Sequence, residues 1–168
     1  MNYDNNRHNA HNEIDHIFQD LFPTRNMAER PEQAALCHRM LDAMVEGGIA
    51  LCDAGTGIGK TYAYLVAGTV YSRFRAACGL ERKPILVSTS SIALQTAARD
   101  EYLPLLSDVL TEDGMIVQPL RAVIRKGKSH YVCDARLEQR LGQLDLQKKN
   151  WKAGAALLSL RGQLDMDE

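Results

Sequence analysis

Apolar residues recur at helical spacing in the first third of the chain. Over residues 11–22 they fall at positions i, i+3, i+4, i+7 and i+8, and Pro23 stops the pattern. Residues 1–10 lack this period and are predicted to be a loose terminus. Pro31 opens a second apolar-periodic segment at a first-turn position, and two glycines at 47–48 end it. The pattern predicts two amphipathic helices that pack against a core.

Further along, short apolar runs alternate with helical segments. The runs predicted as strands are Ile49–Cys52, Pro84–Thr89 and Leu120–Arg125. The segments predicted as helices cover about 59–77, about 92–99 and the chain from Asp134 onward, with Ser90 and Ser91 capping the second of them. Strands that alternate with helices predict an α/β fold, a parallel sheet with flanking helices. In such sheets ligands bind beyond the carboxyl ends of the strands.

Length and composition fit one ordinary globular domain. The chain has 168 residues, of which 45% are hydrophobic and 24% charged. No apolar run approaches the length of a bilayer span, and the polar first residues lack the order of a signal peptide, so we expect a cytoplasmic protein. Four cysteines, at 37, 52, 78 and 133, form no C-x-x-C pair and are expected to be reduced.

The net charge of −1 conceals a basic stretch. Residues 121–152 contain nine Lys or Arg and three Asp or Glu, which makes this window +6 and leaves −7 for the remainder. A basic window in an otherwise acidic chain is a candidate contact surface for a polyanion. The alternative is a solvated helix face.

A glycine-rich stretch follows the first predicted strand. Residues 54–61 read AGTGIGKT, which has P-loop spacing with Ala54 in place of the first glycine. Glycines let backbone N–H groups turn toward phosphate oxygens, and the next helix directs its positive end at the same anion. Lys60 is then placed to meet the β- and γ-phosphates, and the Thr61 hydroxyl to ligate Mg²⁺. The alternative is a glycine-rich turn that binds no ligand.

Four segments in order resemble the DinG-type helicases, close relatives of the XPD helicases in superfamily 2. Residues 30–33 (RPEQ) are similar to the R-x-x-Q element, 53–61 (DAGTGIGKT) to helicase motif I, and 87–95 (VSTSSIALQ) to motif Ia. Residues 126–133 (KGKSHYVC) are similar to the form K/R-G-R-x-N/R-Y-x-C, whose cysteine is the first of four iron–sulfur ligands in the family. Ala54 is an alanine that the family tolerates at this position.

The resemblance implies an incomplete RecA-like first motor domain of an ATP-dependent DNA helicase with 5′-to-3′ polarity. It implies an N-terminal extension at 1–27, the front of the motor domain at 28–132 and the start of an iron–sulfur-type or equivalent helical insertion at 133–168. Arg30 and Gln33 are expected to read the nucleotide base or to brace the loop. The residues expected to bind ATP and Mg²⁺ are Arg30, Gln33, Ala54, Gly55, Thr56, Gly57, Ile58, Gly59, Lys60 and Thr61, with catalytic roles for the last two.

The same resemblance implies single-stranded DNA as partner. The contact residues expected are Thr89, Ser90, Gln95, Lys126 and Lys128, with Cys133 as a ligand of a 4Fe–4S cluster in a full-length parent. The extension at 1–27 would suit the DinG-like proteins of type IV CRISPR systems, whose partner is a ribonucleoprotein complex.

Several helicase elements are missing from the sequence. The chain contains no DEAH-type box, no arginine-finger motif and no cysteine after Cys133. It therefore looks like the front of a longer protein, and we expect the 168 residues alone not to unwind DNA. The alternative is a stand-alone nucleotide-binding or adaptor module that does not hydrolyse ATP. A P-loop kinase is a weaker third possibility, because it leaves RPEQ and the cysteine segment unexplained.

Overall fold

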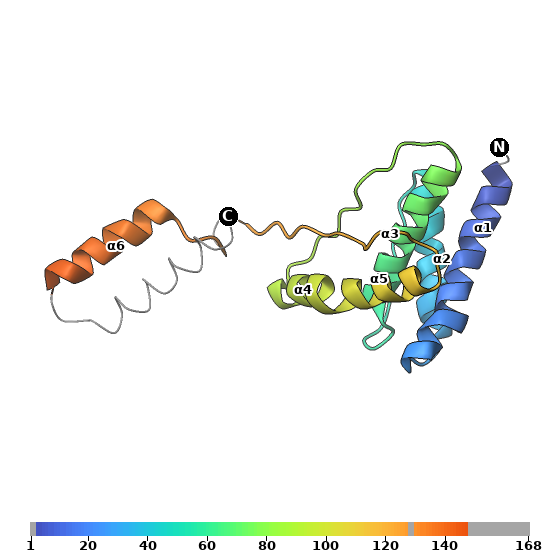
Figure 1. Cartoon of the computed structure of the whole chain (residues 1–168), viewed down its shortest axis with the longest axis horizontal. Helices are drawn as coiled ribbons and strands as arrows, with labels where there is room; N and C mark the ends of the chain where they lie inside the picture. Colours follow the sequence, from blue (N-terminus) through green and yellow to red (C-terminus); the bar gives the residue numbers. More distant parts are fainter. Residues whose placement is uncertain (1–2, 128–129, 148–168) are drawn as a thin grey trace. The chain divides into compact units, whose positions relative to one another are not determined.

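The computed structural model describes residues 3–127 and 130–147, which belong to two compact units, 1–124 and 125–168 (Figure 1). The helices of the first unit are α1 (Tyr3–His16), η1 (Ile17–Leu21), η2 (Phe22–Arg25), α2 (Pro31–Glu46), α3 (Lys60–Ala77), α4 (Ile92–Ala97), η3 (Ala98–Tyr102) and α5 (Leu103–Glu112). The second unit contains α6 (Asp134–Gln147).

The N-terminal residues are helical, so the prediction of a loose terminus at 1–10 was wrong for the part that is described. Helix α1 begins at Tyr3, whose ring packs edge-on against Phe74 with centroids 5.3 Å apart. The Tyr3 hydroxyl donates to the carbonyl of Val45 at 3.2 Å, and the Asn6 side chain donates to the carbonyl of Ala77 at 3.2 Å. These partners lie far along the chain, and no local pattern indicates them.

The predicted helices at 31–46 and 59–77 are confirmed. Pro31 occupies the first turn of α2, where a missing N–H costs nothing, and Gly47 ends the helix with a φ of +67°. Helix α3 buries a stripe of small and apolar side chains, and Gly68 lets the side chain of Ile85 approach its backbone closely. Helices α1, α2 and α3 lie side by side (Figure 1).

The helical run from α4 to α5 confirms the prediction at 92–99 and extends it. Ser91 caps α4, because its hydroxyl accepts the Leu94 N–H at 3.2 Å. Pro104 falls in the first turn of α5, directly after the π-helical turn η3. The run crosses α3 (Figure 1), and Tyr102 of η3 contacts Tyr62 of α3 with ring centroids 5.3 Å apart.

One hydrophobic core joins these helices. Its fully buried larger side chains are Ile14, Ile17, Cys37, Leu41, Val66, Val70, Leu106 and Leu110, from α1, η1, α2, α3 and α5. Burying one such aliphatic side chain stabilises a protein by about 1.5–3 kcal/mol. Helix-on-helix packing therefore stabilises this unit.

The predicted α/β fold with a parallel sheet was wrong. Among residues 3–127 and 130–147 the structure contains helices and no β-strand. The three runs predicted as strands lie outside helices, and several of their apolar side chains are exposed, among them Leu51 at 97%, Leu86 at 92% and Val123 at 84%. A strand completes its hydrogen bonds only with a neighbouring strand, and none of these runs has one within the described residues.

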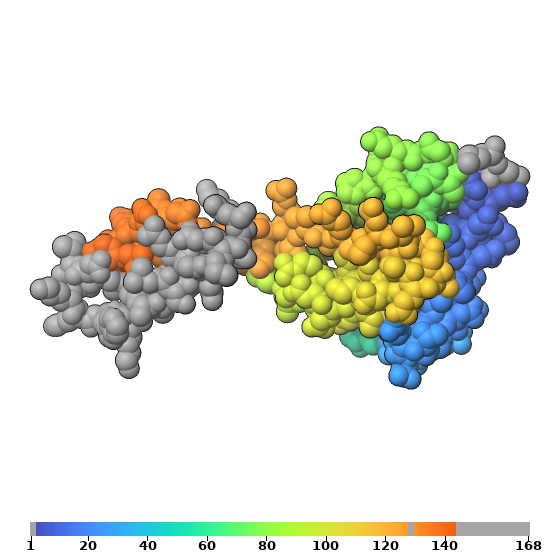
Figure 2. Space-filling model, in the orientation of Figure 1, coloured from blue at the N-terminus to red at the C-terminus, as the bar shows by residue number. Residues whose placement is uncertain are grey.

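Figure 2 shows the runs at 84–89 and 120–125 at the visible surface. In the second unit α6 begins at Asp134, as the sequence predicted. No helix in the described part of the chain combines the length and the hydropathy that crossing a membrane requires.

Candidate functional site

The motif I loop, residues 54–59, connects the first predicted strand run to the N-terminus of α3. Gly57 and Gly59 adopt left-handed backbone conformations, with φ of +86° and +87°. Residues with a Cβ rarely adopt this backbone conformation, which accounts for glycine at these two positions. The loop thereby delivers the chain into α3 at Lys60, with the N–H groups of the first helical turn lacking intrahelical partners.

Two side chains from the start of α2 hold the loop. Arg30 Nη1 donates to the carbonyl of Gly57 at 2.8 Å, and Gln33 Nε2 donates to the carbonyl of Gly59 at 2.5 Å. In a trans peptide the C=O and N–H groups point in opposite directions. The N–H groups of Ile58 and Lys60 therefore face away from these two side chains. The structure thus brings Arg30 and Gln33 onto the loop.

The Lys60 ammonium lies on the loop itself. Its Nζ donates to the carbonyls of Ala54 at 3.0 Å and Gly55 at 2.6 Å. A phosphate offers charge-assisted hydrogen bonds that are stronger than those to a neutral carbonyl. A phosphate placed against the loop would therefore compete with these two carbonyls for the Lys60 ammonium.

The donor groups of the loop fit a phosphate ligand. Glycine residues, the N-terminus of an 18-residue helix and a lysine are brought together at residues 54–60, and all of them favour an anion. Thr61 follows within the first turn of α3, where its hydroxyl is the oxygen ligand available to a phosphate-bound Mg²⁺. Thr56 and Ile58 complete the loop; Thr56 is exposed and Ile58 half-buried.

Aromatic side chains cluster at the first turn of α3, and the sequence analysis missed them. Tyr62 lies two residues after Lys60, and its ring contacts Phe22 and Tyr102 with centroids 5.0 and 5.3 Å away. Burial raises the pKa of the Tyr62 hydroxyl, and the neighbouring Tyr102 adds to the effect. No local pattern marks this cluster, because Phe22, Tyr62 and Tyr102 come from three separate segments of the chain.

The motif Ia residues form a second cluster. The Gln95 side chain donates to the carbonyl of Thr89 at 3.4 Å, and the Thr89 hydroxyl accepts the Ser91 N–H at 3.2 Å. Ser90 lies between them in the turn. The oxygen Oε1 of Gln95 is buried and has no hydrogen-bond partner. These contacts order the entry to α4, but they include no residue of the motif I loop.

The cysteine segment lies in the second unit. The Lys126 N–H donates to the Tyr131 hydroxyl at 3.1 Å, while Lys128 falls outside the described residues. Cys133 is exposed, and its carbonyl accepts the Leu137 N–H at 2.9 Å at the start of α6. One thiol does not hold an iron–sulfur cluster, and the described residues contain no group of three or more His, Cys, Asp or Glu placed to bind a metal. The residues present therefore do not fit the cluster.

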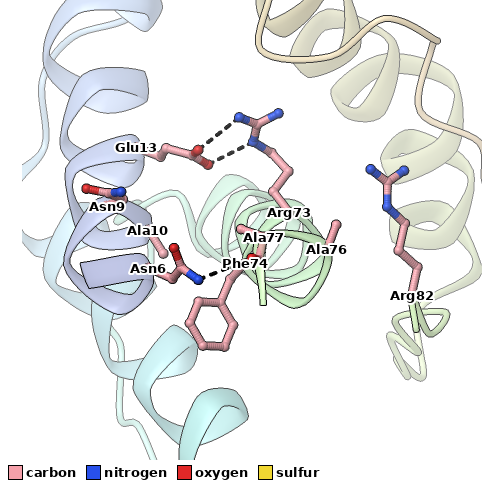
Figure 3. Close-up of a pocket in the computed structure, with 9 residues that line it drawn as sticks. All are labelled: Asn6, Asn9, Ala10, Glu13, Arg73, Phe74, Ala76, Ala77 and Arg82. Atoms are coloured by element: carbon pink, nitrogen blue, oxygen red, sulfur yellow. Dashed lines mark hydrogen bonds and ion pairs between the residues drawn. The ribbon is translucent and has the colours of Figure 1, made fainter. Parts of the chain in front are cut away.

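A hollow of about 240 Å³ lies between α1 and the C-terminal end of α3 (Figure 3). Glu13 and Arg73 form a bidentate ion pair across it, with N···O distances of 2.8 and 2.9 Å, and Arg73 also donates to the carbonyl of Met115. Arg73 is 13 residues beyond Lys60 on one helix, which is about 20 Å at 1.5 Å per residue. The hollow is therefore separate from the motif I loop, and its Glu13 and Arg73 side chains are already paired with each other.

Comparison with known proteins gives relatives for part of the chain. The 3'-5' exonuclease DinG of Bacillus subtilis (strain 168) is 32% identical over 70% of this chain and 11% of its own length. The ATP-dependent helicase DinG of Mycobacterium tuberculosis (strain ATCC 25177 / H37Ra) is 37% identical over 66% of this chain and 15% of its own length. The ATP-dependent DNA helicase YoaA of Escherichia coli (strain K12) is 34% identical, again over 66% and 15%.

The chain thus spans between 11% and 15% of the length of these relatives. No protein-family model matches the chain, and no solved structure matches it. The resemblance to the DinG-type helicases that four sequence segments indicated is confirmed by these relatives.

Proposed function

We propose that this chain, which resembles the DinG-type helicases over about two thirds of its length, is the ATP-binding front part of an ATP-dependent DNA helicase. The observation that carries the proposal is the motif I loop, whose carbonyls are held by Arg30, Gln33 and Lys60 at the N-terminus of α3. Relatives named as ATP-dependent helicases support ATP as the nucleotide.

In this proposal each loop residue has a defined task. Arg30 and Gln33 brace the loop, so that the N–H groups of Ile58 and Lys60 are oriented before the nucleotide arrives. The Lys60 ammonium leaves the loop carbonyls and neutralises the β- and γ-phosphates. Thr61 would hold the Mg²⁺, which would offset the negative charge of the phosphates.

The DNA-binding part of the proposal concerns two segments. The first is the entry to α4, where Thr89, Ser90 and Gln95 contact the backbone of single-stranded DNA. The second is the segment just before Cys133, where Lys126 and Lys128 neutralise DNA phosphates. Unwinding with 5′-to-3′ polarity belongs to a full-length parent. The names of the relatives give no support to a CRISPR ribonucleoprotein as partner.

The substitution Lys60→Ala tests the nucleotide site. Equilibrium titration with a fluorescent ATP analogue in the presence of Mg²⁺ should show binding weaker by about tenfold to 100-fold, since a charge-assisted hydrogen bond contributes about 1.5–3 kcal/mol. Lys83→Ala is the matched control, because Lys83 is an exposed lysine of a loop far from residues 54–61 in sequence. Equal affinity of the Lys60→Ala variant and the parent would exclude the site.

The alternative function, a nucleotide-binding or adaptor module, is separated from the helicase by turnover. The full-length natural protein should hydrolyse ATP faster when single-stranded DNA is added, if it is a helicase. ATP binding without any DNA-stimulated hydrolysis would favour the module.

A further inference from the structure

Two histidines from different helices meet head-on between α1 and α2. The Nδ1 atoms of His11 and His38 lie 2.7 Å apart, which is a hydrogen-bond distance. Each outer nitrogen faces a carboxylate: His11 Nε2 lies 3.1 Å from Asp42, and His38 Nε2 lies 2.9 Å from Asp15. The four side chains form one continuous chain, carboxylate to imidazole to imidazole to carboxylate.

The ring geometry shows that the central contact is nearly straight. The ring centroids are 5.0 Å apart and the ring planes differ by 22°. The centroid separation equals the Nδ1···Nδ1 distance plus the radius of each ring, so both nitrogens lie on the line between the ring centres. The two rings therefore meet edge to edge, and the in-plane lone pair of one Nδ1 is directed at the other.

Counting protons fixes the charge of this arrangement. An Nε2 atom beside a carboxylate must carry a proton to donate, and the straight Nδ1···Nδ1 contact needs one proton between two nitrogens. The pair then holds three protons on four nitrogens, which is one neutral imidazole and one imidazolium. We propose that His11 and His38 share this proton and form a pH-sensitive clasp that attaches α1 to α2.

A bridging metal ion fits the same contact less well. Metal–nitrogen bonds of about 2.0–2.1 Å would hold two nitrogens in a straight arrangement about 4 Å apart, far more than the 2.7 Å observed. The described residues also offer no third ligand at this place. A proton is the occupant that the distance admits.

The charged groups around the clasp are compatible with one positive charge. From α1, Asp15 faces His38, and Arg7 donates to Asp42 at 2.6 Å and to Glu46 at 2.7 Å. From α2, Asp42 faces His11. Burial raises the pKa of Asp42, but the hydrogen bonds and charge interactions with Arg7 and His11 together lower it overall.

Helix α3 packs against both helices, and its Arg73 forms an ion pair with α1. Arg73 of α3 pairs with Glu13, which is two positions from both His11 and Asp15 on α1. Side chains two positions apart on a helix do not share a face. Arg73 therefore belongs to the hollow of Figure 3 rather than to the clasp.

The clasp loses contacts when the pH moves in either direction. A fourth proton places two N–H groups against each other at the centre, and these repel. Removal of the third proton leaves one of the three contacts without a hydrogen, so that a lone pair faces a carboxylate or another lone pair. The attachment should therefore be strongest at an intermediate pH, at which the pair holds three protons, and weaker on either side of it.

Nitrogen NMR of the full chain with labelled histidine tests the shared proton directly. At about pH 6, both Nε2 atoms of the pair should appear protonated, and both Nδ1 atoms should have shifts midway between protonated and bare nitrogen. His8, an exposed histidine of α1, is the internal control, and its Nδ1 and Nε2 shifts should show no proton shared with a second imidazole. Two fully bare or two fully protonated Nδ1 atoms at this pH would overturn the proposal.

A double-mutant cycle tests the clasp energetically. We compare the urea midpoints of the parent, His11→Asn, His38→Asn and the double variant at about pH 4.5, 6 and 8, on either side of the usual histidine pKa. The coupling between the two substitutions should be largest at the middle pH and smaller at both ends. His8→Asn should leave the midpoint unchanged throughout. A coupling that is absent, or that does not vary with pH, would exclude a shared proton even if all variants fold.

Discussion

At the scale of single residues, Gly59 decides whether the motif I loop can form. Its φ of +87° disfavours any residue with a Cβ, and a Cβ built on Gly59 would overlap the side-chain amide of Gln33. Gly57 has nearly the same φ, +86°, but no atom lies within 4 Å of the equivalent position. A substitution at Gly57 therefore tests backbone strain alone, whereas one at Gly59 tests backbone strain together with the close approach of Gln33.

Gly59→Ala should weaken binding of a fluorescent ATP analogue more than Gly57→Ala does. Both substitutions place an alanine in the left-handed region, at a cost of about 1–2 kcal/mol. Only the first also displaces Gln33 from the carbonyl that it holds. Equilibrium titration of both variants measures the difference.

The combination of Gly59→Ala with Gln33→Ala serves as the control, since it removes the overlapping side chain. It should recover part of the stability that Gly59→Ala alone loses, as measured by the urea midpoint. Equal losses of affinity for the ATP analogue in Gly57→Ala and Gly59→Ala would contradict a role for the close approach of Gln33.

At the scale of elements, His16 joins the end of α1 to the end of α5. Its Nδ1 lies 2.7 Å from Asp20 and its Nε2 lies 3.2 Å from Asp113. The hydrogen bond with Asp20, followed by that with Asp113, raises the pKa of His16 above its usual value. A raised histidine pKa means that the folded state favours the charged form.

His16→Asn should destabilise the chain in mild acid and have little effect at alkaline pH. The stabilising contribution is fully present below the pKa of the unfolded state, about 6.5, and disappears as the pH rises through the higher folded pKa. Because the side chain is 41% exposed, we expect a loss of only about 0.5 kcal/mol. Urea midpoints at about pH 5.5 and 8.5, with His8→Asn as control, measure it. The same loss at both pH values would contradict the charge-based account.

At the scale of the whole molecule, the first unit combines a packed helical core with exposed apolar segments. Leu41 is fully buried, whereas Leu51 and Leu86 are 97% and 92% exposed. Apolar groups that stay in water contribute nothing to folding but promote association and the binding of apolar dyes. Leucine therefore stabilises the fold in the core, whereas in the exposed segments it promotes association.

The double substitution Leu51→Ser/Leu86→Ser should leave the urea midpoint within about 0.5 kcal/mol of the parent. It should also reduce fluorescence of an apolar dye and self-association, as measured by light scattering. Leu41→Ser is the matched control and should lose about 2–5 kcal/mol, since it removes buried methyl groups and buries a hydroxyl. Destabilisation of the double variant as severe as that of Leu41→Ser would contradict the exposure of these segments.

Local sequence alone determined most of the helices. Pro31 and Gly47 bound α2, Ser91 caps α4, and α3 begins directly after the glycines of the loop, as predicted. A helix makes its backbone hydrogen bonds within its own segment, so nearby residues suffice to predict it. The family resemblance was also readable, because it rests on short contiguous motifs.

Only the tertiary structure decided the features that depend on distant partners. The apolar runs at 49–52, 84–89 and 120–125 have β-branched composition, yet a strand needs a second strand, and the described residues supply none. The start of α1 at Tyr3 and the meeting of His11 with His38 likewise depend on residues at least 27 positions away. Sequence periodicity reports which face of a segment is apolar, whereas the partner of that face is fixed by packing across the whole chain.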